Sequence, residues 1–346
     1  MIRALTFVVG LVILVALGGV GVGAYVFWQY GRDLPDYRQL ETYTPDVMTR
    51  IYAGDGRLVT EYAIEKRVFV PYNAIPKVVV NAFISAEDQR FFEHPGVDFM
   101  GVARAAITNL RYAGSGRRPV GASTITQQVA KNFLLSNEVS FSRKVKEAIL
   151  AMRIEQAFSK EHILELYLNE IYLGRGSYGV AAAAMNYFNK SLDELSIAEV
   201  AYLAELPKAP NNYNPQRYPE AALARRNWVI GRMAEDGHIT GVDADKAIAE
   251  PLQVSVRGET EFVDHSAYFA EDVRRDIVNR YGEKALYKGG LAVRTTLEPK
   301  LQDLATRSLR DGLEAYDRRH GWRGPLGRIE LDQSWGIRLR DAQVGV

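Results

Sequence analysis

Two adjacent acids follow an amphipathic segment of the chain. The spacing of apolar residues predicts a helix over residues 76–86, and Glu87 and Asp88 come directly after it. The carboxyl end of a helix disfavours further negative charge, so a desolvated carboxylate there should have a raised pKa, as a general acid or base needs. The alternative is a frayed helix end with solvated charges, which these residues alone favour. His94, six residues on, is by itself more often a structural hydrogen-bonding group than a catalyst.

A second polar segment covers residues 121–132. Thr124 and Gln127 have the spacing of a capping box, which predicts that a helix begins here. Thr124, Gln128 and Lys131 would share one face of it. The free N–H groups of a helix start, with a lysine two turns along, can hold an anion such as a diphosphate. The alternative is a capped amphipathic helix with a solvated polar face.

A third segment combines Arg143, Lys144 and Glu147. Arg143 and Glu147 are four residues apart, so they can pair across one turn of a helix. The alternative is an exposed ion pair, which contributes only about 0.3–0.5 kcal/mol. The glycine pattern of residues 174–179 resembles a dinucleotide-binding loop, but it follows a predicted helix instead of a strand, so we reject that interpretation.

Composition excludes several classes of protein. The 346 residues are 47% hydrophobic and 25% charged, as in ordinary folded proteins, which argues against disorder and low complexity. The 43 basic and 42 acidic side chains give a net charge of +1, so nothing global favours nucleic acid. The absence of cysteine excludes disulfides, thiolate metal sites and a cysteine nucleophile. The sequence also contains no paired-histidine zinc motif.

The elements that must position these residues begin with an apolar segment. No charged side chain occurs between Arg3 and Arg32, which predicts a transmembrane helix over residues 4–30 after a cytoplasmic tail of residues 1–3. The alternative is a signal peptide cleaved after residues 22–24. Apolar residues continue beyond that site to Trp28, which favours an uncleaved anchor.

The rest of the chain changes character twice. Residues 31–47 are predicted to form a stalk, and short strands are expected within residues 48–70. From Pro76 to about residue 240 the periodicity is helical. The remainder mixes both patterns: strand-like segments at Leu252–Val256 and Leu291–Leu297, helices at Tyr268–Tyr281 and Pro299–Tyr316, and no clear element in the last thirty residues.

Several blocks, in one order, resemble the motifs of the peptidoglycan glycosyltransferase family, and the resemblance covers roughly residues 49–240. The blocks are Glu87-Asp88-Gln89-Arg90-Phe91 with His94 and Gly96; Gly121–Gln128 with Lys131-Asn132; Arg143-Lys144 with Glu147; Lys160 with Ile163-Leu164-Glu165 and Tyr167-Leu168-Asn169; and Arg175-Gly176 with Tyr178-Gly179, Ala183-Ala184 and Tyr187-Phe188. Asn189 departs from the pattern, because the family usually has glycine there.

The resemblance implies a mainly α fold. A lysozyme-like glycosyltransferase domain of residues 48–240 would stand behind the transmembrane helix, on the periplasmic side of the bacterial inner membrane. It implies polymerisation of lipid II into β-1,4 glycan strands with release of undecaprenyl diphosphate. The expected partners are lipid II, the growing glycan, the inner membrane and other cell wall synthesis proteins, with no nucleic acid.

The resemblance also assigns roles to residues. Glu87 would be the general base, and Glu147 would position cations or shape the donor site. The substrate-binding residues would be Lys131, Arg143, Lys144, Gln128, Ser123, Thr124, Asp88, Asn132 and Asn169, of which Asp88, Gln128 and Asn169 are expected to support the others. No cofactor is implied as necessary, although a divalent cation (Mg or Mn) could assist.

Residues 241–346 are similar to a linker and an incomplete α+β start of the transpeptidase region of a class A penicillin-binding protein. Residues 268–274 and 289–297 carry this similarity. Such a parent would also be a penicillin-sensitive DD-transpeptidase. The Ser-x-x-Lys and Lys-Thr-Gly motifs of that activity do not occur here, so we expect a fragment or truncated product without it. A glycan-cleaving enzyme of lysozyme type and a non-catalytic wall-binding protein remain alternatives.

Overall fold

The computed structural model describes residues 25–43, 45–112, 121–135, 138, 140–254, 263, 265–321, 324–325, 328–332 and 334–341, with residues 14, 18, 21 and 23. The predicted transmembrane segment of residues 4–30 therefore lies mostly outside the described residues. Residues 25–31 are helical. Among the residues that the structure describes, no helix combines the length and apolar character needed to cross a bilayer.

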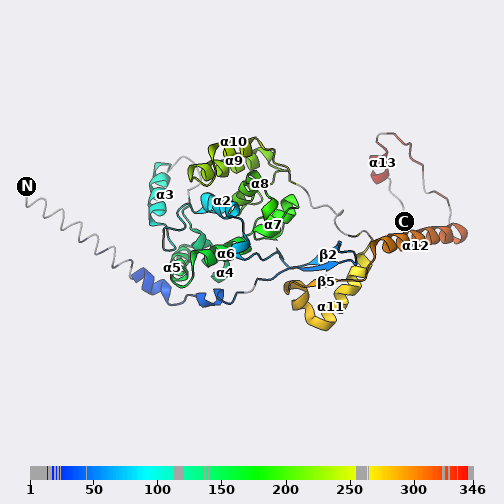
Figure 1. Cartoon of the computed structure of the whole chain (residues 1–346), viewed down its shortest axis with the longest axis horizontal. Helices are drawn as coiled ribbons and strands as arrows, with labels where there is room; N and C mark the ends of the chain where they lie inside the picture. Colours follow the sequence, from blue (N-terminus) through cyan, green and yellow to red (C-terminus); the bar gives the residue numbers. More distant parts are fainter. Residues whose placement is uncertain are drawn as a thin grey trace, which may run out of the picture.

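Most of the described chain is a helical body (Figure 1). Its helices are α2 (Lys77–Glu87), α3 (Phe99–Arg111), α4 (Ile125–Leu134), α5 (Phe141–Ala157), α6 (Lys160–Glu170), α7 (Val180–Phe188), α8 (Ile197–Glu205), α9 (Pro219–Glu235) and α10 (Gly241–Ala249), with 3-10 turns η1 (Tyr37–Leu40), η2 (Tyr72–Ala74), η3 (Leu192–Glu194) and η4 (Leu206–Lys208). The short strands β3 (Lys66–Arg67) and β4 (Ser177–Tyr178) pair in parallel at its edge. The body thus includes residues that precede the predicted strands, because Leu40 of η1 is buried in its core.

Local sequence signals explain where the site-bearing helices begin. Thr124 forms the predicted capping box with Gln127 at the start of α4, and Ser196 forms another at the start of α8. The Ser140 side chain accepts the backbone N–H of Arg143 at the start of α5. These caps satisfy amide groups that would otherwise lack partners, so α4 and α5 start at fixed positions beside the site.

One hydrophobic core holds the helical body together. Phe83 of α2, Leu150 of α5 and Tyr202 of α8 are fully buried in it. Helix α8 packs against both α2 and α9, and α4 packs against α5 and α6. The end of α2, where the two acids lie, is therefore surrounded by packed helices.

A second, smaller core lies beside the body. Strands β2 (Leu58–Tyr62), β1 (Thr49–Tyr52) and β5 (Ala292–Arg294) form a sheet in which β1 is antiparallel to β2 and parallel to β5. Helix α11 (Ala267–Lys288) packs on β1 and β2 and bends at Gly282, whose φ is +82°. Because β1 and β2 bury side chains here, this core joins the first residues of the predicted 48–240 domain to residues that follow the domain.

Two predictions for the last third of the chain are wrong. Residues 251–254 are not a strand, because Leu252 and Val254 pack against the main core without a partner strand. Residues 255 and 256 of that predicted strand lie outside the described residues. A short helix, α13 (Trp335–Asp341), occurs where no element was expected. Helix α12 (Pro299–His320) is confirmed, and it extends away from both cores (Figure 1).

Candidate functional site

Glu87 is the last residue of α2, as the helical periodicity predicted. Its carboxylate accepts a hydrogen bond from Gln128 Nε2 of α4 at 2.7 Å. Desolvation raises the pKa of Glu87, while the Gln128 hydrogen bond, Arg225 and Lys208 act in the opposite direction. A carboxyl group with a raised pKa at the wall of a cavity is suited to proton transfer.

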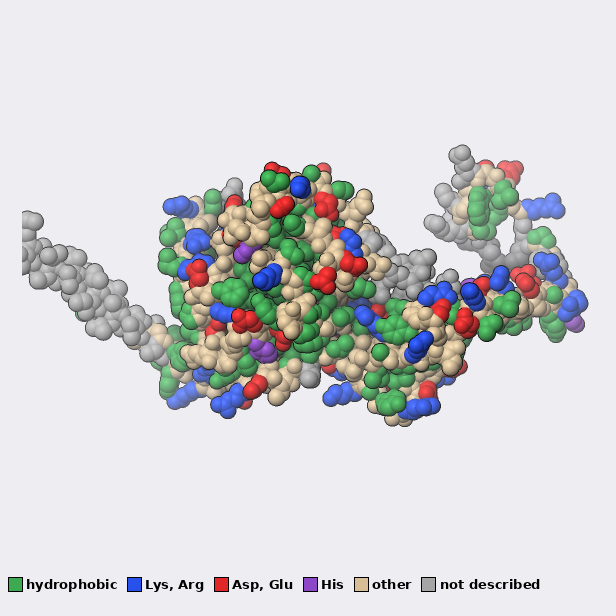
Figure 2. Space-filling model, viewed as in Figure 1, with side chains coloured by type: hydrophobic (Ala, Val, Ile, Leu, Met, Phe, Trp, Pro, Cys, Tyr) green, Lys and Arg blue, Asp and Glu red, His purple; other side chains and the backbone are tan. Residues whose placement is uncertain are grey.

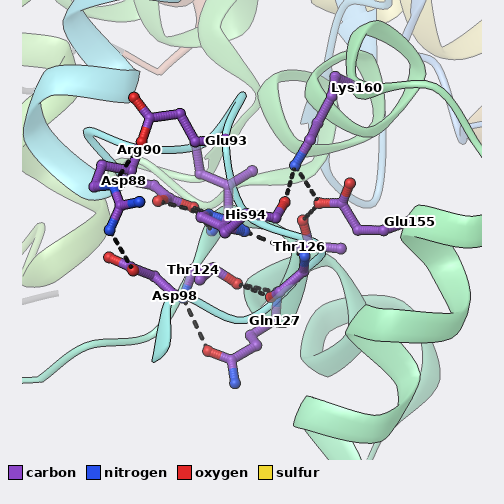
Figure 3. A network of polar contacts seen from close by, with 12 residues as sticks. Asp88, Arg90, Glu93, His94, Asp98, Thr124, Thr126, Gln127, Glu155 and Lys160 are labelled. Carbon is purple, nitrogen blue, oxygen red and sulfur yellow. Dashed lines mark hydrogen bonds and ion pairs between the residues drawn. The ribbon is translucent and has the colours of Figure 1, made fainter. Parts of the chain in front are cut away.

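Asp88 has a structural position directly beside it. Its carboxylate is buried and pairs with His94 Nε2 at 2.9 Å, and it accepts the backbone N–H of Ile125 at 2.9 Å (Figure 3). The backbone N–H of Gly96 donates to His94 Nδ1 at 3.2 Å. Since Nδ1 is an acceptor, the imidazole proton lies on Nε2 and points to Asp88. Asp88 therefore joins the end of α2 to the start of α4.

The loop after Asp88 is fixed against α5 and α6. Gly96 has a φ of +94°, and a Cβ there would lie 2.6 Å from the carbonyl oxygen of Ala151, so only glycine fits. Lys160 donates to the carbonyl oxygen of His94 and to Glu155, both at 2.8 Å (Figure 3). These contacts hold the loop rigid beneath Glu87.

We predict that Asp88→Asn lowers the free energy of unfolding by about 1–3 kcal/mol, because the neutral amide loses the charge-assisted hydrogen bonds that the carboxylate accepts from His94 and Ile125. Urea unfolding followed by circular dichroism measures this change. Glu93→Gln is the matched control, since Glu93 lies on the same loop with its side chain 64% exposed and, among the described residues, pairs only with Arg90. Equal stability of Asp88→Asn and wild type would contradict the structural role.

A cavity of 750 Å³ opens on one side of Glu87. Its lining residues come from α2, α4, α5, α9 and the segment after α8, and they are Ala86, Glu87, Gly121, Ser123, Gln127, Gln128, Lys131, Lys144, Glu147, Pro207, Lys208, Tyr213, Arg225 and Trp228. Four of them are basic and two are acidic. The cavity is therefore a polar site with a surplus of positive charge.

Lys131 lines this cavity, as the α4 face predicted. Within the described part of the chain its ammonium group has no hydrogen-bond or ion-pair partner, and the same holds for Lys208. Lys208 has a lowered pKa, caused first by desolvation and then by Arg225. Unpaired cations held in a cavity are arranged to meet an anionic ligand.

Sequence reasoning missed Lys208 and Arg225. Arg225 projects from α9, and its guanidinium lies 3.6 Å from the ring centroid of Trp228. Its neighbour Arg226 is buried and donates to the carbonyl oxygens of Glu250 and Ile248. Nothing in the sequence separates these two arginines. Lys208 carried a weak signal, because it follows the helix-ending Pro207 in a connecting segment.

Glu147 and Lys144 also line the cavity. The Glu147 side chain is only 1% exposed, and it pairs with Arg143 and, at 2.6 Å, with Lys144 Nζ. Lys144 also donates to Ser123 Oγ at 2.9 Å. The predicted pair is thus confirmed, and its carboxylate is buried instead of solvated.

A second cavity of 290 Å³ lies on another side of Glu87. It is enclosed by the end of α2, by α3 and by α9, and its lining includes Asp88, Arg104, Thr108 and Arg232. Ala86, Glu87, Gly121, Ser123 and Trp228 line both cavities. Glu87 is therefore a shared wall between two binding spaces.

Five predicted binding residues do not line the larger cavity. Arg143 pairs with Glu147, and Asp88 lines the smaller cavity. Asn132 is exposed. Asn169 is 2% exposed, and its side chain exchanges two hydrogen bonds of 2.8 Å with the backbone of Val70. Thr124 caps α4 and donates to the carbonyl oxygen of Gly96, but it lines the smaller cavity. Asn169 and Thr124 hold elements together.

In the described ranges, no three His, Cys, Asp or Glu side chains come together as a metal site. Glu147 is already neutralised by Arg143 and Lys144. The basic side chains of the cavity are thus the positive charges that this chain itself offers to a ligand.

Comparison with known proteins gives three findings. Residues 55–234 match the Transglycosylase family model. Penicillin-binding protein 1A of Rickettsia felis is 51% identical over 333 residues, which cover 96% of this chain and 42% of that protein. Penicillin-binding protein 1A of Escherichia coli is 45% identical over 299 residues, 84% of this chain and 35% of that protein. The chain thus spans less than half the length of these relatives.

Among solved structures, a crystal structure of penicillin-binding protein 1A from Haemophilus influenzae is similar. The sequences are 30% identical, and the TM-score is 0.48. The match covers 87% of this chain and 35% of that one.

Proposed function

The chain belongs to the transglycosylase family, and from this premise we propose that it polymerises lipid II into β-1,4-linked glycan strands, releasing undecaprenyl diphosphate. The observation that carries the proposal is the position of Glu87 between two cavities, one of which has unpaired cations on its wall. A transferase that joins two sugars needs a base at the boundary between a donor and an acceptor.

The larger cavity fits the lipid-linked donor. Lys131 and Lys208 would contact the diphosphate, and Lys144 would contact it from the opposite wall. As the bond from C1 to the phosphate oxygen breaks, negative charge grows on the leaving diphosphate. Fixed cations that are already in place stabilise that charge without reorganisation.

The smaller cavity fits the acceptor sugar. Its 4-hydroxyl oxygen would attack C1 of the donor sugar, and Glu87 would take the hydroxyl proton. Attack from the face opposite the leaving diphosphate converts the α linkage to a β linkage. Because Glu87 acts as the unprotonated carboxylate, its activity is present above its raised pKa and is lost as the pH falls through it.

The environment of Glu147 disfavours the glycan-cleaving alternative. Hydrolysis with two carboxyl groups requires one of them to donate a proton to the leaving oxygen. Glu147 accepts hydrogen bonds from both Arg143 and Lys144, so its two oxygens are occupied by cations and do not face a leaving group. A hydrolase of uncharged sugars would also have no use for the unpaired lysines.

The membrane arrangement is part of the proposal. We infer an anchor over residues 4–30, a lysozyme-like catalytic domain on the periplasmic side, and a longer parent with a transpeptidase domain. Helix α3 supports membrane proximity, because Phe99, Met100, Ile107 and Leu110 are all exposed beside the smaller cavity. Hydrophobic side chains gather on that edge of the body (Figure 2).

We predict that Lys131→Ala lowers kcat/KM for lipid II about tenfold or more, because a hydrogen bond to a charged group contributes about 1.5–3 kcal/mol. Its stability should stay unchanged, since Lys131 has no partner among the described residues. Initial rates across lipid II concentrations measure the effect. Lys146→Ala on α5 is the control, because Lys146 does not line the cavity. Equal kinetics of Lys131→Ala and wild type would remove Lys131 from the diphosphate site.

A further inference from the structure

An apolar groove of 320 Å³ lies between α5 and the end of the N-terminal helix. Val26 and Phe27 line one side, and Val145, Ala148 and Met152 line the other. Of its described lining residues, only Lys144 is charged. A groove of this kind can take a hydrocarbon ligand but offers little to a sugar or a peptide backbone.

The walls of the groove are held together by one arginine. Arg153 of α5 donates to the carbonyl oxygen of Gly31 at 3.2 Å, and its guanidinium lies 5.9 Å from the ring centroid of Phe27. These contacts fasten the end of the N-terminal helix to α5. The groove is therefore a built feature of the fold, and one of its sides is the end of the segment that we place in the membrane.

Lys144 connects the groove to the larger cavity, because it lines both. Its ammonium group donates to Glu147 at 2.6 Å and to Ser123 at 2.9 Å, and both of those residues line the cavity. A lysine often covers apolar surface with its stem while its charge stays in a polar place. A molecule with an anionic head and a hydrocarbon chain would match this arrangement, with its head in the polar cavity and its chain in the apolar groove.

We propose that the groove binds the first isoprene units of the donor substrate, whose diphosphate lies at Lys144 and Lys131. This inference rests on the proposed function and adds the position of the lipid chain. The chain would leave the cavity at Lys144, follow Val145, Ala148 and Met152 along α5, and enter the bilayer beside the N-terminal helix. The groove thereby makes the enzyme selective for long polyprenyl chains.

The test compares lipid II of natural chain length with a short-chain, otherwise identical lipid II in the same detergent. Ala148→Phe fills the groove, and Gln156→Phe adds the same ring at an exposed position two turns further along α5. We expect Ala148→Phe to raise KM for the long-chain substrate about tenfold, as when two or so methylene groups lose their packing. The KM of Ala148→Phe for the short-chain substrate should stay at the wild-type value. The KM values of Gln156→Phe for both substrates should also stay at wild-type values.

Met152→Ala provides a second variant, which removes part of the wall without adding bulk. It should raise KM for the long-chain substrate in the same direction. If neither variant raises KM for the long-chain substrate, or if KM rises by the same factor for both substrates, the groove does not bind the donor chain and holds only bilayer lipid. If wild-type protein polymerises neither substrate, the proposed function itself is wrong, which separates the two failures.

Discussion

Glu87→Gln is expected to lower the rate of lipid II polymerisation by about 10²- to 10⁴-fold, the contribution usual for general base catalysis. Glutamine has nearly the same volume and can still accept from Gln128. It cannot take a proton at neutral pH. The measurement is the initial rate of glycan formation with saturating substrate, so that the loss is seen in kcat.

The stability of Glu87→Gln, unlike its activity, should not fall. Desolvation raises the pKa of Glu87, so burial disfavours the ionised side chain in the folded state. The neutral glutamine removes this cost, and Glu87→Gln should unfold at the same temperature as wild type or a slightly higher one. Glu93→Gln on the exposed loop is the control for both readouts. Wild-type turnover by a folded Glu87→Gln protein would eliminate Glu87 as the base.

Glu147→Gln has the second-largest expected effect. Its carboxylate neutralises Arg143 and Lys144 at the cavity wall, and without it the two cations repel one another. Loss of one fixed electrostatic group typically costs about 10²–10³ in turnover. We therefore expect kcat/KM for lipid II to fall by about that factor.

Glu147→Gln should also reduce stability, unlike Glu87→Gln. Breaking a buried ion pair by removing one partner costs about 3–5 kcal/mol, and we expect the lower end because the Lys144 side chain is 47% exposed. Thermal unfolding and lipid II kinetics on the same preparations measure both effects. Glu161→Gln, at an exposed position of α6, is the control. A Glu147→Gln protein with unchanged activity would show that the pair does not organise the donor site.

The sequence predicted those site features that depend on local spacing. The end of α2 places Glu87, the capping box at Thr124 places α4, and the four-residue spacing of Arg143 and Glu147 lets them pair within α5. Each follows from helix geometry over one or two turns. Local sequence patterns were therefore enough to predict how α2, α4 and α5 contribute to the site.

Features that depend on packing between distant segments could not be predicted. Arg225 and Arg226 are neighbours in sequence, yet one lines the cavity and the other bonds to the backbone after α10, since they point to different sides of α9. Asn169 was expected to support the binding residues, but its partner, Val70, lies 99 residues away and could not be predicted. The parallel pairing of β1 with β5 likewise joins residues more than two hundred positions apart.

The domain boundaries of the sequence analysis stay predictions. The family match over residues 55–234 includes β2, whose side chains pack in the smaller core with β5 and α11. Alternating apolar residues predict a strand, but they do not say which core it will join. The strand prediction fails at residues 252–254 for the same reason.

The central claim is tested most directly by incubating the purified wild-type chain with lipid II and separating the products by size. We predict glycan strands of increasing length and release of undecaprenyl diphosphate, both abolished in Glu87→Gln. Unchanged lipid II, or soluble muropeptides released from isolated cell walls in place of polymer, would contradict the assignment of this site to glycosyl transfer.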